Sequence, residues 1–172
     1  MPLLCLRCST PIPAEPDEAA WVCAQCGQGM QLDLKVGLEK LDINYHAGIA
    51  QGASGRPYWV CDGRVEMRKR ETYGGTDKNA AAFWSQPRRF FIPAYTATLE
   101  ALLAAGLQLL QNPPALQPGP PAPFQPVTRA AEEVRSAAEF LVMAVEAGRK
   151  DRLKKLDFVL ELGPLALWIL PG

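Results

Sequence analysis

The chain has 172 residues, and its 18 Lys and Arg residues are balanced by 18 Asp and Glu residues, so the formal net charge is zero. Hydrophobic residues make up 48% and charged residues 21%, which is typical of a folded globular protein and excludes a chain that is disordered throughout. Neutrality also argues against a protein that coats nucleic acid or acidic lipid through bulk charge, which leaves only a local basic patch for such a role.

Four of the five cysteines form two C-x-x-C pairs near the start of the chain, Cys5 with Cys8 and Cys23 with Cys26. Each pair can place two thiolates on one turn, and two such turns facing each other make a tetrahedral cage of four sulfurs. Four protein ligands leave no position for water or substrate, so the pattern predicts a structural Zn2+ site. A module of about 30 residues buries little apolar surface, and we expect the metal to supply its folding free energy.

Two other chemistries use cysteines in this pattern. Rubredoxins hold iron in the same four-sulfur geometry, but they have a wider gap between the pairs and an aromatic core that this module lacks. A redox dithiol normally stands between a strand and a helix, and the sequence around these cysteines does not predict that context. We therefore assign residues 1–32 to a zinc ribbon. Its second turn has Gly27 after the last cysteine, whereas the first turn has Ser9 at that place.

Residues 33–172 predict a second domain of the α+β class, with an antiparallel sheet and two helices. Alternation of apolar and polar residues over 32–36 predicts a short strand that leaves the ribbon, and glycines over 47–57 predict a loop. From Tyr58 the alternation is longer and predicts a half-buried strand. Its expected inner face holds Trp59, Cys61, Gly63, Val65 and Met67, and its outer face holds Val60, Asp62, Arg64, Glu66 and Arg68. A turn at Gly74-Gly75 and a strand over 90–92 follow.

Leucines at helical spacing predict a helix over residues 98–111 that ends before Pro113. Residues 113–126 hold seven of the 16 prolines and predict an extended linker. We expect Thr128 to cap a second helix, whose buried stripe is Val134, Ala138, Leu141 and Val145. The basic residues over 149–155 suit the negative end of that helix dipole.

The tail predicts two strands around Gly163-Pro164. The second is very apolar (Leu165, Leu167, Trp168, Ile169 and Leu170), so it is either completed by a partner or buried inside the same chain. Residues 87–93 and 164–171 each frame an apolar strand with prolines. This similarity suggests an internal repeat, but in a proline-rich chain we attribute it to coincidence.

No residue stands out as catalytic. His46 is the single histidine and Cys61 the single cysteine outside the pairs, so a Cys–His pair is formally available. Cys61 lies on the apolar face of its strand, however, where a buried and inert thiol is the usual outcome. The chain has no phosphate-binding G-x-x-x-x-G-K-[ST] loop and no G-x-S-x-G nucleophile elbow.

Several basic residues suggest a nucleic-acid strip, because cations interleaved with aromatic rings suit single strands. They are Arg64, Arg68, Lys69, Arg70, Arg88 and Arg89, near Trp84 and Phe90. Glu66, Glu71 and Asp77 interrupt the strip, and we favour a solvated strand face or a charged edge strand.

Three short segments carry a resemblance: Tyr58-Trp59-Val60, Phe83-Trp84 and residues 87–95 (PRRFFIPAY). With the four cysteines they resemble small prokaryotic zinc-ribbon proteins that join such a ribbon to an aromatic-rich C-terminal domain. The departure is Val60-Cys61, which stands where these proteins commonly have Pro-Phe. The resemblance implies a zinc site but no activity, since the family has none assigned. Helicase-like labels that some members carry rest on the ribbon alone.

Together these observations predict a non-enzymatic adaptor or accessory subunit that holds Zn2+ and acts through a protein partner or a multi-subunit complex. The alternative is a nucleic-acid-binding zinc-ribbon protein in transcription or replication. No signal peptide is apparent at the start, and no apolar run approaches the ~20 residues that span a bilayer, so we expect a cytoplasmic protein without a transmembrane segment.

Overall fold

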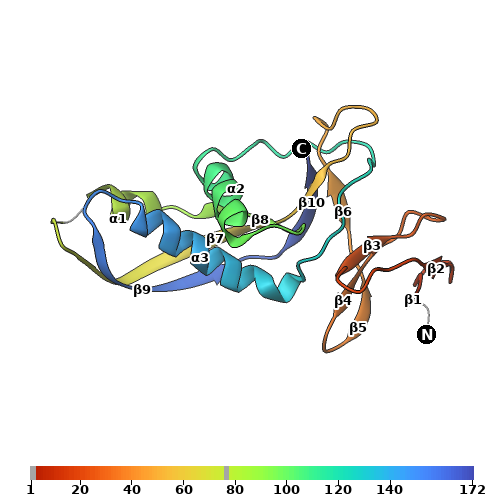
Figure 1. Ribbon diagram of the computed structural model, residues 1–172, viewed down its shortest axis with the longest axis horizontal. Coiled ribbons are helices and arrows are strands. Elements are labelled where there is room, and N and C mark those ends of the chain that lie inside the picture. Colours follow the sequence, from red (N-terminus) through yellow and green to blue (C-terminus); the bar gives the residue numbers. More distant parts are fainter. Residues whose placement is uncertain (1–2, 76–77) are drawn as a thin grey trace.

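The computed structural model describes residues 3–75 and 78–172 and contains a small module and a larger sheet domain (Figure 1). The four-cysteine module, residues 3–40, holds five short strands in two antiparallel sheets. The sheet domain holds one five-stranded sheet and all the helices of the described chain. The predicted α+β class with a ribbon-like start is confirmed. Residues 1–2 of the predicted ribbon, and Asp77, lie outside the described part.

The module consists of two hairpins and an additional strand. One hairpin pairs β1 (Leu3–Leu4) with β2 (Pro11–Ile12), and the other pairs β3 (Ala20–Val22) with β4 (Gly29–Asp33). The fifth strand, β5 (Gly37–Lys40), pairs back on β4. The three-stranded sheet therefore continues past residue 32, where we expected the ribbon to end.

The predicted strand over residues 32–36 is wrong, because β4 ends at Asp33 and the chain reverses there. The Asp33 carboxylate accepts hydrogen bonds from the backbone N–H groups of Lys35 and Val36, at 2.7 and 2.9 Å. Such a bonded aspartate stabilises a turn that its own side chain defines. Leu34 and Val36, which we expected on one face of a strand, lie on this turn.

The long strand β7 (Arg56–Thr72) is the centre of the larger sheet. Along one edge it pairs antiparallel with β10 (Ala166–Leu170) and then with β9 (Leu153–Leu162), and β8 (Arg88–Pro93) pairs with it at Tyr58–Gly63. The outermost strand, β6 (Ile43–Tyr45), pairs with β10 in parallel, which is the exception to the expected antiparallel sheet. The predicted long strand, the strand over 90–92 and the two strands around Gly163-Pro164 are confirmed.

A β-bulge between Met67 and Lys69 interrupts the alternation of β7. Upstream of it Val65 faces the core and Arg64 faces solvent, as predicted, but the predicted exposure of Val60 is wrong: it is buried in a second core cluster with Tyr58 and Phe91. Past the bulge the faces exchange, since an extra residue shifts the period by one. Arg70, which we expected in an outward strip with Arg68, consequently points inward.

Helices α2 (Leu99–Gln111) and α3 (Val134–Ala147) cover one face of the sheet (Figure 1). They pack closely at Gly106, where an added Cβ would stand 2.8 Å from Leu141 Cδ1. The core beneath them includes Trp59, Phe90 and Ile92. The predicted extent of α2 is confirmed, and the Thr98 side chain caps it by accepting a hydrogen bond from the Ala101 N–H.

Two expectations about the helices are wrong. A third helix, α1 (Lys78–Trp84), was not predicted, since seven residues are too few to show a helical period. Thr128 does not cap α3: its N–H donates to Ala94 O at 2.7 Å, and a 3-10 turn (Ala131–Glu133) leads into the helix instead. The Glu133 carboxylate accepts from the Ala130 N–H at that start.

The proline-rich segment, residues 113–126, is not a free linker but a strap bound along the sheet domain. Gly119 N–H donates to Tyr45 O at 2.7 Å, Gly55 N–H donates to Pro123 O at 2.8 Å, and Ala19 N–H of the module donates to Val127 O at 2.7 Å, just beyond the strap. Leu116 packs on the sheet face opposite to the main core, beside Tyr58 and Phe91. Prolines lack N–H donors, so the strap donates from Gly119 and Gln125 and accepts through other carbonyls, including that of Pro123.

The apolar strand β10 is an interior strand, which settles the choice between a partner and the chain itself. It lies between β6 and β7, and Leu167 and Ile169 are fully buried. This strand therefore gives no support for a partner surface.

A buried ion cluster holds α3 to the end of β7. Glu146 is 0% exposed, and its carboxylate accepts from Arg70 Nε at 2.6 Å, Trp84 Nε1 at 2.7 Å and Arg149 Nε at 2.9 Å. Arg70 also donates from both terminal nitrogens to the Asp151 carboxylate, at 2.5 and 2.8 Å. Because each charge is paired and hydrogen-bonded, the cluster is tolerated inside the protein, and loss of one member leaves the others uncompensated.

We expect Glu146→Gln to lower the free energy of unfolding by about 3 kcal/mol, because it leaves the buried Arg70 with one counter-charge in place of two. The matched control is Glu139→Gln on the same helix, where an exposed pair with Arg135 at 3.9 Å predicts a loss under ~0.5 kcal/mol. Urea unfolding of both variants measures the difference, and equal losses would contradict the assignment.

The same carboxylate makes stability depend on pH. Burial raises the pKa of Glu146, but hydrogen bonds from Trp84, Arg70 and Arg149 outweigh it, and the net pKa lies below the usual value for glutamate. The stabilisation is thus present at neutral pH and is lost as the pH falls toward this lowered pKa. Glu146→Gln removes that contribution, so the variant is expected to lose less stability in acid than the parent.

Candidate metal centre

The four paired cysteines lie on two turns of nearly the same geometry, one in each hairpin of the module. In the first turn Ser9 N–H donates to Cys5 O at 2.9 Å, and in the second Gly27 N–H donates to Cys23 O at 2.8 Å. The first residue of each turn is also bonded to the outgoing strand, Cys5 N–H to Thr10 O and Cys23 N–H to Gln28 O, both at 2.9 Å. Each hairpin therefore aims two sulfurs in one direction.

Both turns end on a residue in the left-handed region, Ser9 with φ 57° and Gly27 with φ 72°. Glycine adopts this region without strain, whereas a residue with a Cβ does so at a cost of about 1 kcal/mol. The first turn therefore has the same conformation as the second although it has Ser9 in place of a glycine, and Ser9 is strained there.

The four sulfurs gather at one point. All four Sγ atoms lie within 4.8 Å of one another, and the distances across the two turns are 3.6 Å for Cys5–Cys26 and for Cys8–Cys23. Four sulfurs at ~2.3 Å from a central zinc would stand about 3.8 Å apart, so the observed spacing fits a tetrahedral ion. The predicted ligands Cys5, Cys8, Cys23 and Cys26 are brought together, and as a group they could hold a metal ion.

The cysteines differ in how readily they lose a proton. The Thr10 hydroxyl lies 3.2 Å from Cys8 Sγ, and hydrogen bonds with the Thr10 side chain and backbone lower the pKa of Cys8 to about 6. A backbone hydrogen bond with Gln28 lowers the pKa of Cys26, but burial and the other three cysteines outweigh it and raise that pKa to about 12. A bound cation would favour the thiolate form of all four.

The module is attached to the sheet domain through β3, the strand that leads to Cys23. Ala20, next to Trp21 of the module core, forms an isolated bridge with Val127 and belongs to the main core of the sheet domain. Trp21 is held in turn by the Glu18 carboxylate, which accepts from its Nε1 at 2.8 Å. A change at the sulfurs can thus reach the end of the strap through β3.

A redox dithiol is disfavoured by this geometry. Each C-x-x-C pair lies in a turn between two short strands, and neither stands at the N-terminus of a helix, where a dipole would activate one thiol. Sulfurs of different pairs also lie only 3.6 Å apart, so the four cysteines form one cluster and not two separate dithiols. Iron in the same four-sulfur cage remains compatible with these distances.

Cys61 and His46 are not paired with each other. Cys61 is 3% exposed in the core, where burial and then the charge of Asp62 raise the pKa of its thiol to about 11. His46 Nδ1 accepts from the Gly48 N–H at 2.9 Å, so its Nε2 carries the proton and donates to Ala115 O at 2.9 Å. The histidine therefore binds the strap to the loop after β6.

The predicted basic strip is divided among separate environments. Arg64 and Arg68 are exposed on the outer face, the Arg70 side chain is only 9% exposed, and Arg89 pairs with Asp62 at 2.9 Å. Arg88 lies over the Phe83 ring, 4.0 Å from its centroid. Trp84 and Phe90, the aromatic residues we expected beside the strip, are buried and present no ring for stacking.

Comparisons with known proteins add no relative. No protein-family model matches the chain, and neither a curated protein nor a solved structure matches it. The resemblance to small prokaryotic zinc-ribbon proteins therefore stays a prediction. Within residues 3–75 and 78–172, no helix has the length and apolar character required to cross a membrane.

We expect Cys→Ser at any of the four ligands to abolish metal binding and unfold the module locally, while the sheet domain stays folded, because the ion holds the two hairpins together. Metal analysis of the parent protein should give one ion per chain. Hydrogen exchange should accelerate in β3 and β4 and stay slow in β7 and β9. Cys61→Ser serves as the control with full metal content, and unchanged metal content in the ligand variants would contradict the site.

A second pair of variants tests the turns. Ser9→Gly should stabilise the metal-bound module by up to about 1 kcal/mol, and Gly27→Ala should destabilise it by a similar amount, because each changes only the cost of the left-handed conformation. No atom within 4 Å would meet a Cβ at Gly27, so packing does not confound the comparison. Competition with a chelator measures both, and a shift in the same direction for the two variants would contradict this account.

Proposed function

We propose that the protein is a zinc-binding adaptor or accessory subunit that acts through protein–protein interaction, without catalysis of its own. The zinc ion would be structural, held by Cys5, Cys8, Cys23 and Cys26. Four cysteine sulfurs within 4.8 Å of one another support this, since together they would fill the four positions of a tetrahedral zinc and leave none for a substrate. In the reducing cytoplasm, where we place the protein, such thiolates stay available to a metal.

The observation that carries the proposal is the exposed apolar turn between β4 and β5. Leu34 is 83% and Val36 67% exposed, and they are the two most exposed aliphatic side chains among the large hydrophobic residues that the structure describes. Large apolar side chains that project singly are common, but two together on a projecting turn provide an anchor for a partner.

This turn is also held in one conformation. The Asp33 carboxylate bonds two successive N–H groups, which lowers its pKa, and Gly37 takes the left-handed φ of 89° that closes the hairpin. A fixed turn loses little conformational entropy when a partner binds, so its aliphatic side chains contribute more of their burial to affinity. The module thus presents two aliphatic side chains, Leu34 and Val36, at one end of the β4–β5 hairpin. The cysteine cluster lies near the other end, where β4 begins shortly after Cys26.

The proposal is tested by capture of partners from the native host with the tagged full chain at mild salt. Leu34→Ser with Val36→Ser should lose a stoichiometric protein partner, by more than tenfold, and should keep the metal. The matched control is Leu99→Ser on α2, which removes another exposed leucine, 56% exposed, from outside the module. Partners retained by the double variant, or nucleic acid captured with no protein, would contradict the proposal.

A further inference from the structure

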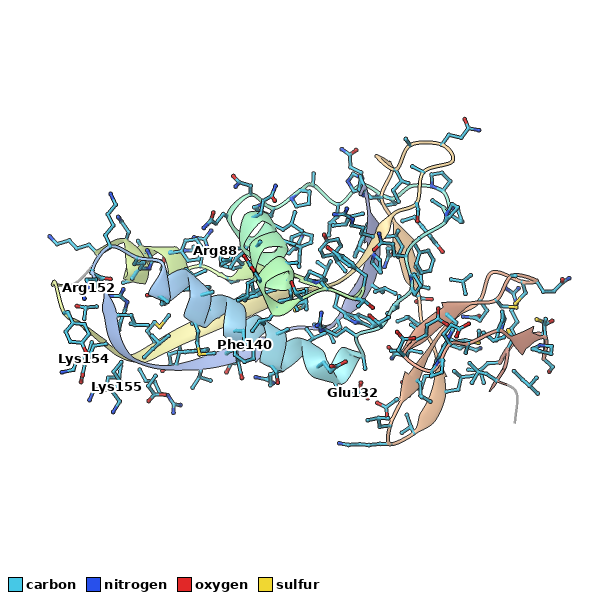
Figure 2. The ribbon with its side chains drawn as sticks, in the orientation of Figure 1. Arg88, Glu132, Phe140, Arg152, Lys154 and Lys155 are labelled. Atoms are coloured by element: carbon cyan, nitrogen blue, oxygen red, sulfur yellow. The ribbon has the colours of Figure 1, made fainter. Side chains whose placement is uncertain are left out.

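The neutral chain separates its charges between its two ends. Residues 3–42, which form the module and its exit, hold three Lys and Arg and six Asp and Glu, a net charge of −3. Residues 66–75, 78–79 and 146–158, where β7 and α3 end and β9 begins, hold nine Lys and Arg and five Asp and Glu, a net charge of +4. Figure 2 shows Arg152, Lys154 and Lys155 at the end of the molecule opposite to the module.

This basic end is not the helix-terminal cluster that the sequence predicts. Helix α3 ends at Ala147, and Arg152, Lys154 and Lys155 lie beyond it, on the following turn and on β9. We define the basic tip as Tyr73, Lys150, Arg152, Lys154 and Lys155, all of them exposed.

The basic tip surrounds an aromatic ring with cations. Tyr73 is 69% exposed, and its ring centroid lies 5.9 Å from the Arg152 guanidinium carbon and 5.8 Å from Lys154 Nζ. An exposed ring flanked by cations is the arrangement that binds single-stranded nucleic acid, in which a base stacks on the ring and the cations meet phosphates.

Three acidic side chains near the tip are already engaged by other cations. Glu146 and Asp151 are bound by Arg70, and Glu71, which faces Lys155 across the strands, pairs with Lys69 at 2.8 Å. No ion pair joins Lys150, Arg152 or Lys154 to an acidic side chain in the part of the chain that the structure describes. Their charges are thus available to an external anion.

The backbone at Arg152 gives a second observation. It has φ 55°, the left-handed region that a long side chain adopts only at a cost, and its carbonyl accepts from the Tyr73 N–H at 3.0 Å. Glycine or asparagine would fit this turn better. Strained residues that a fold retains are concentrated at functional sites, and here the strain places a guanidinium beside an exposed ring.

We propose that the basic tip binds single-stranded nucleic acid, with a base stacked on Tyr73 and the phosphate backbone held by Lys150, Arg152 and Lys154. This site lies at the opposite end from the cysteines and does not depend on the proposed function of the module. An adaptor with both surfaces would attach a protein partner at one end to a strand at the other.

The test is titration of a fluorescent oligothymidylate with the full metal-loaded chain over a range of salt concentrations. Tyr73→Ala should weaken binding about tenfold without changing the salt dependence, since it removes stacking alone, and Tyr73→Phe should bind like the parent. Lys150→Gln with Lys154→Gln should also weaken binding, and should reduce the slope of log K against log salt by about 1.4, the value for two lost phosphate contacts on a single strand.

A matched control neutralises two lysines at the acidic end, Lys35→Gln with Lys40→Gln. It gives the protein the same net charge as the tip variant and should bind the strand as tightly as the parent. Arg152→Asn should weaken binding while the protein stays as stable as the parent or becomes more stable, because asparagine tolerates the left-handed turn.

Three outcomes would overturn the proposal. If the Lys150/Lys154 variant and the Lys35/Lys40 variant lose the same affinity, binding depends on the net charge of the protein and not on the basic tip. If the protein binds a duplex of the same length as tightly as the single strand, and Tyr73→Ala does not change that affinity, then no base of a single strand stacks on Tyr73. Binding to vesicles of anionic lipid, with no binding to the oligonucleotide, would assign the tip to a membrane surface.

Discussion

The backbone of β7 requires hydrogen-bond partners along 17 residues, and the sheet domain is organised around this requirement. No single strand is long enough to supply them. Two strands, β10 and β9, follow each other along one edge, and β8 covers the other edge only at its first half. The chain must therefore return to β7 from three separate places, and the helices and the strap are the connections between those returns.

The bulge near residue 68 determines what happens at the far half of β7. By exchanging the faces it turns Arg70 toward α3, where a lone guanidinium would be unfavourable without counter-charges. Glu146 and Asp151 satisfy it from the last turn of α3 and the turn beyond, and this fixes the position of the residues that lead into β9. This ion cluster and a second register shift between Glu71 and Thr72 together precede the surface formed by Tyr73 and Arg152.

The features that could be predicted from the sequence are those that local spacing determines. Cysteine spacing predicts all four ligands, and apolar periodicity predicts β7 and α2, because each pattern lies within one element. The other features depend on distant partners. The prolines of the strap show where N–H donors are missing, but they do not show from which N–H groups its carbonyls accept hydrogen bonds. The residues of the Asp33 turn alternate between apolar and polar as a strand does, and only the hydrogen bonds to the Asp33 carboxylate distinguish the two. The bulge has no signal that distinguishes Arg70 from Arg68.

The parallel pair formed by β6 and β10 has a consequence for how the protein forms during synthesis. Ile43 pairs with Leu167, so more than 120 residues separate two strands that lie side by side. Until the ribosome has produced β10, the start of β7 lacks a neighbour on that edge and β6 has no place in the sheet. Contacts of such long sequence separation form slowly and leave strand edges open to aggregation in the meantime. The cysteine module, by contrast, has its four cysteines and its five strands within the first 40 residues, so the pairing of its strands does not wait for β10.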